Sequence, residues 1–171
     1  DGVTIRIVDE DGADLPPGEP GEILIRCDTL MKGYWRLPEE TAAVLDDGWY
    51  RTGDVGSRDA SGYLTIRDRI RDMVISGGEN VYPAEVEAAL ASHESVGEIA
   101  VIGRPCDRWG EAVTAVVVPK PDRMVDEAEL IAYARGRIAH YKCPSKVIIA
   151  DELPKNAGGK VLKRVLRERY C

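Results

Sequence analysis

The spacing of apolar residues changes near residue 70, and this change limits the folds open to the chain. Before it, alternating apolar and polar residues predict strands and a single short helix, which begins at Pro38. After it, apolar strands are mixed with helices expected at 83–92 and 126–138. We therefore expect an α+β fold, with a β-rich segment over residues 1–70 and a compact α+β domain over residues 71–171.

Local signals place the elements along the chain. Asp126, with Glu129 three residues later, predicts a capped start for the helix at 126–138. Two glycine-containing stretches, 76–80 and 153–160, are expected to be loops. The final helix is expected from an apolar stripe made by Val161, Leu162, Val165 and Leu166. Strands are expected at 3–8, 22–27, 63–67, 73–75, 99–103, 112–118 and 147–149.

Composition and charge exclude several classes of protein. The formal net charge of -7 does not suit a general binder of nucleic acid, because phosphate contacts need a concentrated basic surface. No apolar run approaches the ~20 residues of a membrane-spanning helix, and the N-terminus lacks a signal-peptide pattern. His93 and His140 are too few and too far apart to suggest a metal site. The cysteines form no CxxC pair, so we expect reduced thiols in a cytoplasmic protein. They are Cys27, Cys106, Cys143 and Cys171.

Asp54 is the first candidate binding residue. It follows a Thr-Gly pair in the stretch 50–54, YRTGD, where we expect it at the tip of a loop with both carboxylate oxygens available. Such a carboxylate suits two vicinal hydroxyls, as on a ribose. The alternative is a solvated aspartate that only caps a turn, because aspartate is favoured there in any case.

Gly77 and Gly78 form the second candidate. Paired glycines let a backbone approach a ligand closely, and the helix that begins at Pro83 would place its positive end nearby. The alternative is a tight connection from strand to helix that binds nothing.

Lys160 is the third candidate, at the end of the glycine-containing stretch 153–160. A lysine on a flexible loop can present a positive charge to a phosphate or a carboxylate. The stretch is not a phosphate-binding P-loop, since Val161 stands where that motif needs Ser or Thr. The alternatives are a surface lysine, and a basic C-terminus that is simply the solvated face of the last helix.

Taken in order, several motifs resemble the adenylate-forming superfamily, and most of all its fatty acyl-CoA synthetases. The resemblance covers essentially the whole chain. The motifs are Gly21-Glu22-Ile23, Met31-Lys32-Gly33-Tyr34-Trp35, YRTGD at 50–54, Arg69, ISGGENVYPAEVE at 75–87, Trp109-Gly110-Glu111, Lys142-Cys143-Pro144 and LPKNAGGK at 153–160.

The resemblance implies a reaction in two steps. A carboxylate first attacks the α-phosphate of ATP to give acyl-AMP and pyrophosphate, and the CoA thiolate then gives acyl-CoA and AMP. It implies that Asp54 binds the ribose hydroxyls and that Arg69 and Tyr50 also contact the nucleotide. Lys160 would stabilise the negative charge that builds up on the α-phosphate in the first step.

The resemblance also implies that the small C-terminal domain rotates for the second step. Gly77 and Gly78 would then line the channel for the pantetheine arm, with Trp109 and Tyr141 packing against CoA. Arg71 stands at the hinge, where the family more often has Asp or Lys.

The basic residues near the expected CoA site depart from the family's pattern. Relatives carry basic residues at the positions of Cys143 and Ser145, whereas the cations here are Lys142 and Lys146. Whether Lys142 and Lys146 hold the phosphates of CoA is therefore left open.

Three readings remain open. The first is that the whole protein is an acyl-CoA ligase. The second is that it is a relative, such as an amino-acid adenylation domain, a luciferase-like oxidase or a carrier-loading ligase. The third reading is a non-catalytic binding or assembly module. The chain has no initiator Met and begins in a strand pattern, so we expect a C-terminal fragment that lacks most of the large lobe and is inactive alone.

The expected ligands and partners follow from the same resemblance. They are a carboxylic acid, ATP, CoA and Mg²⁺, with ATP and Mg²⁺ held mainly by the lobe that is missing and no metal site in this chain. The acyl pocket lies outside the chain, so its sequence does not give the length of the acid. Exposed strand edges would favour a strand-paired or swapped oligomer of the fragment.

Overall fold

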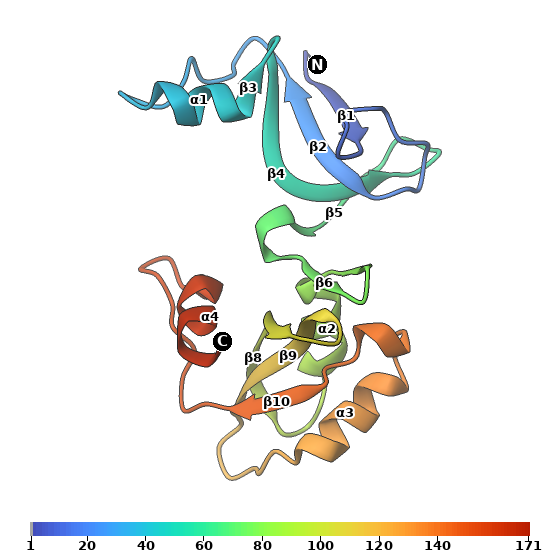
Figure 1. Ribbon diagram of the computed structural model, residues 1–171, viewed down its shortest axis with the longest axis vertical. Coiled ribbons are helices and arrows are strands. Elements are labelled where there is room, and N and C mark those ends of the chain that lie inside the picture. Colours follow the sequence, from blue (N-terminus) through green and yellow to red (C-terminus); the bar gives the residue numbers. More distant parts are fainter. Residues whose placement is uncertain (1) are drawn as a thin grey trace. The chain divides into compact units, whose positions relative to one another are not determined.

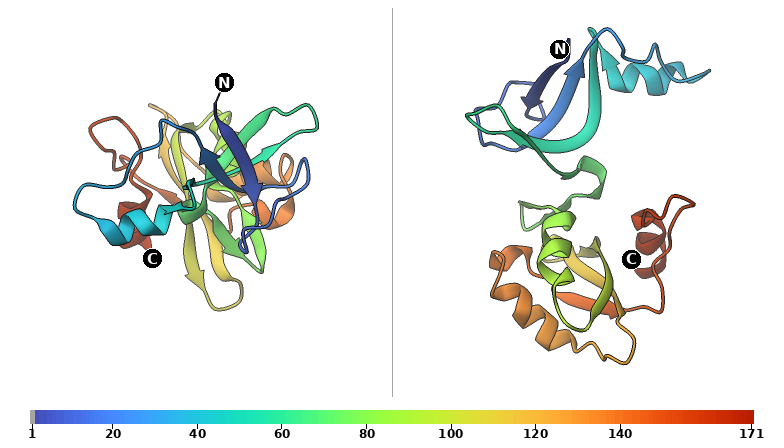
Figure 2. Two further views of the ribbon diagram at one scale, coloured as in Figure 1. Left: turned by 90° about the horizontal axis from the view of Figure 1, so that it is seen from above. Right: turned by 180° about the vertical axis from the view of Figure 1, so that it is seen from behind.

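The computed structural model describes residues 2–171, which divide into two compact units. The first ends at Arg71, and the second is Asp72–Cys171. The boundary expected from the sequence lies one residue earlier. Figures 1 and 2 show the elements of each unit.

The first unit is a five-stranded sheet with one short helix. The strands run in the order β1-β2-β4-β3, and β5 pairs with β4. Pro38 occupies the first turn of the helix, as expected. The elements are β1 (Thr4–Val8), β2 (Gly21–Arg26), α1 (Pro38–Val44), β3 (Leu45–Asp46), β4 (Trp49–Arg58) and β5 (Leu64–Arg69).

The core of the first unit is small. Ile7 and Val8 of β1, Ile23 and Leu24 of β2 and Val55 of β4 are buried, while α1 has no buried residue. α1 therefore contributes no buried side chain to this core.

The stretch around Asp54 is a strand and not the loop that the sequence predicted. Asp54 lies within β4, opposite Arg69 of β5. Thr-Gly was read as a turn because glycine is favoured there. In the structure Gly53 has a φ of 68°, and the ladder with β5 shifts register between Val55 and Gly56, so the strand bends without ending.

The second unit packs helices on both faces of a sheet. Its elements are β6 (Val74–Ser76), β7 (Glu79–Val81), α2 (Pro83–Ala91), β8 (Val96–Cys106), β9 (Gly110–Pro119), α3 (Glu127–Arg135), β10 (Lys146–Ile149) and α4 (Lys163–Tyr170). β9 lies in the middle, antiparallel to β8 and parallel to β10. The α+β class expected from the sequence is confirmed.

Successive side chains of β8 and β9 lie on opposite faces of the sheet and belong to two separate hydrophobic cores. Val101 and Val117 face the side covered by α2 and α3, whereas Ile102 and Val116 face the side covered by α4. Figure 1 shows α4 on one side of the sheet and α3 on the other. Leu166 is the fully buried residue of α4 and belongs to the second core.

One helix boundary matches the expected position, and two differ from it. The Asp126 side chain accepts a hydrogen bond from the backbone N–H of Glu129, which confirms the predicted cap. The helix ends at Arg135, before Gly136, so Ile138 packs against the core from outside it. Val161 and Leu162 precede α4 and are not within it.

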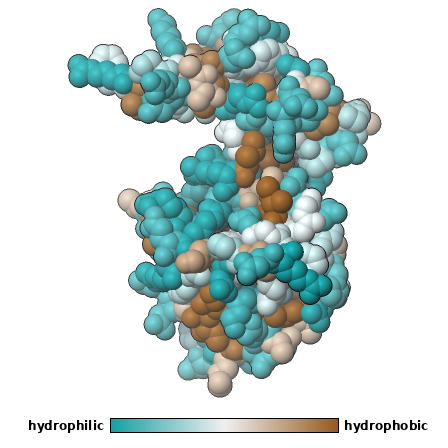
Figure 3. Space-filling view, in the orientation of Figure 1, coloured by the Kyte–Doolittle hydropathy of each residue, from teal (hydrophilic) through white to brown (hydrophobic). Residues whose placement is uncertain are grey.

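The surface of the second unit is largely hydrophilic in the view of Figure 3, with separate apolar areas. Over residues 2–171, no helix is both long and apolar enough to cross a membrane.

Candidate functional site

Asp54 and Arg69 form an ion pair on neighbouring strands of the first unit. The Arg69 Nε lies 2.9 Å from Asp54 Oδ1, and the Asp54 side chain remains 26% exposed. The backbone of Asp54 is fixed as well, because its N–H donates to the Thr52 hydroxyl, which in turn donates to the carbonyl of Ile23. The pair therefore presents a carboxylate in a set orientation that solvent can reach.

Tyr50 and Tyr34 stand beside this ion pair. A side-chain hydrogen bond with Tyr34 is the main cause that raises the pKa of the Tyr50 phenol, with burial and the charge of Asp54 adding to it and Arg69 opposing it. Tyr50 thus keeps its proton at neutral pH and offers a hydroxyl group next to a carboxylate. The structure brings together the three residues that the resemblance assigned to the nucleotide, and adds Tyr34.

Gly77 and Gly78 form the two-residue turn of a β6–β7 hairpin, whereas the sequence predicted a loop over residues 76–80. Ser76 pairs with Glu79, and the φ angles of the glycines are 61° and 84°. The Gly77 N–H donates to the carbonyl of Trp109 over 2.8 Å. A Cβ on Gly77 would lie 3.0 Å from the Trp109 ring, while one on Gly78 would meet nothing within 4 Å.

Glu111 anchors the same hairpin. Its carboxylate accepts a hydrogen bond of 2.8 Å from the backbone N–H of Ile75 in β6. Only one residue pair, Ser76 with Gly110, joins β6 to β9. The Glu111 contact therefore adds to the short pairing that joins this hairpin to β9.

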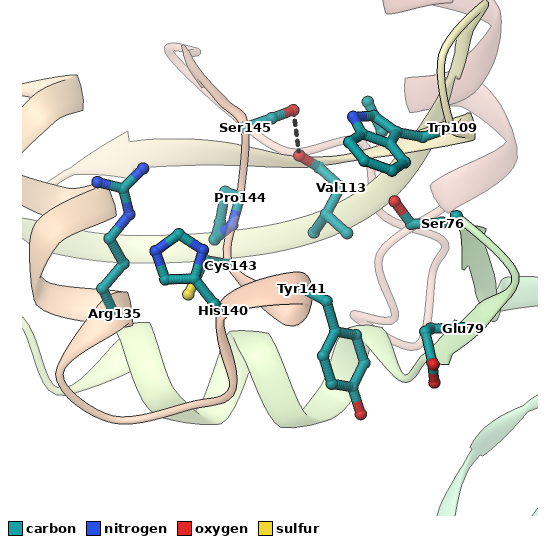
Figure 4. Close-up of a pocket in the computed structure, with 12 residues that line it drawn as sticks. Ser76, Glu79, Trp109, Val113, Arg135, His140, Tyr141, Cys143, Pro144 and Ser145 are labelled. Carbon is teal, nitrogen blue, oxygen red and sulfur yellow. Dashed lines mark hydrogen bonds between the residues drawn. The ribbon is translucent and has the colours of Figure 1, made fainter.

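A pocket of about 470 Å³ opens beside the hairpin. Figure 4 shows the side chains that line it. Three of the four residues expected at the CoA channel lie here, namely Gly77, Trp109 and Tyr141, and Gly78 does not line it. The two aromatic side chains are each 46% exposed. The other lining residues are Ser76, Glu79, Ala112, Val113, Arg135, His140, Cys143, Pro144 and Ser145.

Lys142 and Lys146 are both engaged by carboxylates. The Lys142 Nζ lies 2.7 Å from each carboxylate oxygen of Glu85, and this hydrogen bond raises the pKa of Lys142. The Lys146 Nζ lies 3.2 Å from Glu127. Neither lysine lines the pocket.

Cys143 is a buried thiol on the pocket wall. Burial raises its pKa, and its Sγ contacts the carbonyls of Ile138 and Ala139. All four cysteines are free.

Lys160 ends an exposed turn that Asn156 closes. The Asn156 side-chain oxygen accepts hydrogen bonds from the N–H groups of Gly158 and Lys160, at 3.0 and 2.9 Å. The sequence predicted a flexible loop here from the glycines of the stretch 153–160. It did not reveal the hydrogen bonds of Asn156. Lys155 in the same turn pairs with Glu98 at 2.6 Å, whereas no ion pair of Lys160 occurs among the described residues.

Arg71 is exposed in a short 3₁₀ turn, Ile70–Asp72, and it is the last residue of the first unit. The next residue, Asp72, is tied to α4. Arg167 donates to the Asp72 carboxylate over 3.2 Å and to its carbonyl over 3.4 Å. The start of the second unit is thus fixed to its own last helix.

No cluster of three or more His, Cys, Asp or Glu side chains suited to a metal ion occurs in the described part of the chain. We assign no residue here to Mg²⁺.

Comparison with known families matches two parts of the chain. The AMP-binding enzyme C-terminal domain matches residues 85–160, and the AMP-binding enzyme family matches residues 1–35. The chain belongs to this family of AMP-binding, adenylate-forming enzymes, and it corresponds to their C-terminal portion.

Two curated relatives show how similar the chain is to enzymes of known activity. It is 49% identical to an indoleacetate–CoA ligase of Aromatoleum aromaticum over 96% of this chain and 32% of that protein. It is 48% identical to the long-chain-fatty-acid–CoA ligase FadD13 of Mycobacterium tuberculosis over 97% of this chain and 33% of that protein. The chain thus spans about a third of the length of the curated relatives it matches.

The solved structure of MatB from Rhodopseudomonas palustris gives the comparison for the fold. With ATP bound, MatB matches with a TM-score of 0.93 and 45% identity, over 99% of this chain and 34% of MatB. Apo MatB matches with a TM-score of 0.69 and 46% identity over the same shares. The matched region of MatB therefore differs in shape between its two solved forms.

The roles of five residues in these sites could not be assigned from the sequence. Tyr34 and Glu111 stood inside quoted motifs, but only the structure shows what they contact. Asn156 was part of the lysine motif, and its role in closing the turn depends on backbone geometry. Arg135 and His140 reach the pocket from α3 and from the turn that follows it, and no local pattern marks them.

Proposed function

We propose that this chain is the C-terminal third of an AMP-forming acyl-CoA ligase. The observation that carries the proposal is that the second unit presents two separate candidate sites. One is the exposed Lys160 in its closed turn, and the other is the pocket beside Gly77. Two such sites suit a reaction in two steps, because the first step needs a positive charge near the phosphate and the second needs a passage for the thiol.

In the first step, a carboxylate oxygen attacks the α-phosphate of ATP, and pyrophosphate leaves to give acyl-AMP. Asp54 and Tyr50 offer acceptors and donors to the ribose hydroxyls, while Arg69 orients Asp54. Lys160 supplies a positive charge to the phosphoryl oxygens as negative charge accumulates there.

In the second step, the CoA thiolate attacks the acyl carbon, and AMP leaves as acyl-CoA forms. The left-handed Gly77-Gly78 turn provides a stretch of backbone without side chains, along which a thin pantetheine arm can pass. Arg71 would serve as the hinge that exchanges the two sites. The difference in TM-score between the two solved forms of MatB supports a change of shape in this region.

The substrate is a carboxylic acid, for which a fatty acid is our first candidate because FadD13 is among the relatives. We propose that the 171-residue chain alone lacks activity, since the relatives it matches are about three times as long. A cytoplasmic location and pairing of copies through strand edges stay predictions. Light scattering of the purified chain would test the pairing.

The test of the proposed function uses the full-length protein that carries this sequence. Acid-dependent exchange of labelled pyrophosphate into ATP should occur without CoA, and release of AMP together with an acyl thioester should need CoA. Carboxylic acids from short to long chains, with aromatic acids included, would define the substrate. Exchange without any CoA-dependent turnover would favour a different member of the superfamily.

A further inference from the structure

The pocket beside the hairpin has two chemically different ends. Trp109 and Tyr141 lie toward one side of it in Figure 4, and Arg135 and His140 lie next to each other on the opposite side. The wall that joins them is formed by Cys143, Pro144 and Ser145. A pocket of about 470 Å³ is within the usual size range for small-molecule sites.

The cationic end does not use the lysines that the sequence pointed to. Glu85 and Glu127 hold Lys142 and Lys146, and the residues at positions 143 and 145 carry no charge. The Ser145 hydroxyl donates to the carbonyl of Val113. Arg135 is the one arginine or lysine among the described residues that line the pocket, and no ion pair of its guanidinium occurs among them.

The single carboxylate on the pocket wall lies away from Arg135. Glu79 comes from β7 of the hairpin and stands beside Tyr141 in Figure 4. An anionic group is therefore repelled from the aromatic end and attracted to the opposite one. A ligand with a flat ring at one end and phosphate at the other would be bound in a single direction.

We propose that Arg135 and His140 bind the phosphate groups at the nucleotide end of CoA, with the base against Trp109 and Tyr141. The inference rests on the proposed function and assigns the charge in this site to residues that the sequence patterns did not indicate. A guanidinium presents a planar set of donors that matches phosphate oxygens, and the imidazole of His140 adds a donor beside it. Stacking of the base on an aromatic ring binds any purine without reading its edge.

The test compares Arg135→Ala and His140→Ala in the full-length protein with CoA and with pantetheine, which lacks the nucleotide and its phosphates. The KM for CoA should rise on the order of tenfold in Arg135→Ala, as expected for the loss of a charge-assisted hydrogen bond. The KM for pantetheine should not change. His140→Ala should show the same pattern with a smaller rise.

Arg137→Ala is the matched control. Arg137 is an exposed arginine two residues after Arg135, but it does not line the pocket, and its guanidinium lies over the Tyr133 ring. Its removal changes the net charge by the same amount and leaves the pocket wall intact, so the KM for CoA should remain near the wild-type value. An equal rise in Arg137→Ala and Arg135→Ala would overturn the proposal, and so would an equal rise for CoA and pantetheine in Arg135→Ala.

Binding of adenosine 3′,5′-bisphosphate, followed by calorimetry, separates this inference from the proposed function. The wild-type protein should bind it, and Arg135→Ala should weaken binding on the order of tenfold. Binding that Arg135→Ala leaves unchanged would overturn the inference even if the protein is a CoA ligase. Absence of CoA-dependent turnover, with Arg135-dependent binding retained, would overturn the proposed function alone.

Discussion

Asp54 and Arg69 occupy facing positions on β4 and β5, and the Arg69 Nε lies 2.9 Å from the Asp54 carboxylate. The guanidinium fixes one carboxylate oxygen, Oδ1. The Asp54 side chain is 26% exposed, so its carboxylate remains within reach of a ligand hydroxyl.

Asp54→Asn in the full-length protein should weaken ATP binding. An amide keeps the shape but loses the charge, so both the pairing with Arg69 and the bond to a ribose hydroxyl weaken. We expect a loss of about 1.5–3 kcal/mol in ATP binding, the range for hydrogen bonds to charged groups. Isothermal titration calorimetry with ATP measures it.

Asp14→Asn is the control for this change, because Asp14 also pairs with an arginine Nε, that of Arg6, at 2.7 Å. Its ATP affinity should equal that of the wild type. Equal losses in the two variants would mean that Asp54 acts through stability alone.

Gly77→Ala should slow thioester formation more than Gly78→Ala does. Both alanines would be strained at a positive φ, by roughly 1–2 kcal/mol. Only the Cβ at position 77 would also press on Trp109, at 3.0 Å. Single-turnover reaction of purified acyl-AMP with CoA measures the effect, and equal rates for the two variants would show that the contact with Trp109 does not matter.

Glu111→Ala should also slow the thioester step, because it removes the hydrogen bond by which β9 holds the Ile75 N–H of the hairpin. Glu111→Gln keeps an acceptor oxygen at the same position and should restore most of the rate. Pyrophosphate exchange, which needs no CoA, should be similar in both variants. If Glu111→Gln fails to restore the rate, the thioester step depends on the negative charge of Glu111 and not on its hydrogen bond.

The sequence predicted the second unit more accurately than the first. In the second unit, runs such as 112–118 are apolar because both sheet faces are covered, and the Asp126 cap is a local signal that the structure confirms. In the first unit, Gly53 suggested a turn, but pairing with β2 and β5 keeps β4 extended. Long-range pairing of this kind leaves no mark in the local sequence.

The same limit applies to the sites. The motifs marked Asp54, Arg69 and Lys160 as candidates, because each stands in a series of motifs in fixed order. The ion pairs of Lys142 and Lys146, by contrast, join residues 57 and 19 positions apart. Whether a lysine is available to bind a ligand depends on such contacts. The sequence therefore did not decide which basic residues bind the phosphates of CoA.

The Lys142–Glu85 pair should stabilise the fold up to strongly alkaline pH. The pKa of Lys142 is raised by its hydrogen bond to Glu85, so its contribution is fully present below the unfolded-state pKa of about 10.4 and is lost as pH rises through the higher folded value. The melting temperature of Lys142→Met should be below that of the wild type at pH 8, and the gap should narrow as pH rises above the unfolded-state value. A gap that stays constant over this range would mean that the charge of Lys142 does not contribute.

Lys160 gives the most direct test of the central claim, that the second unit serves the two steps with different sites. In the full-length protein, Lys160→Ala should slow pyrophosphate exchange on the order of 100-fold, as for loss of one stabilising group at a developing charge. Reaction of purified acyl-AMP with CoA should stay within about twofold of wild type. Lys155→Ala, in the same turn but paired with Glu98, should leave both rates unchanged. Equal slowing of both steps by Lys160→Ala would contradict the account.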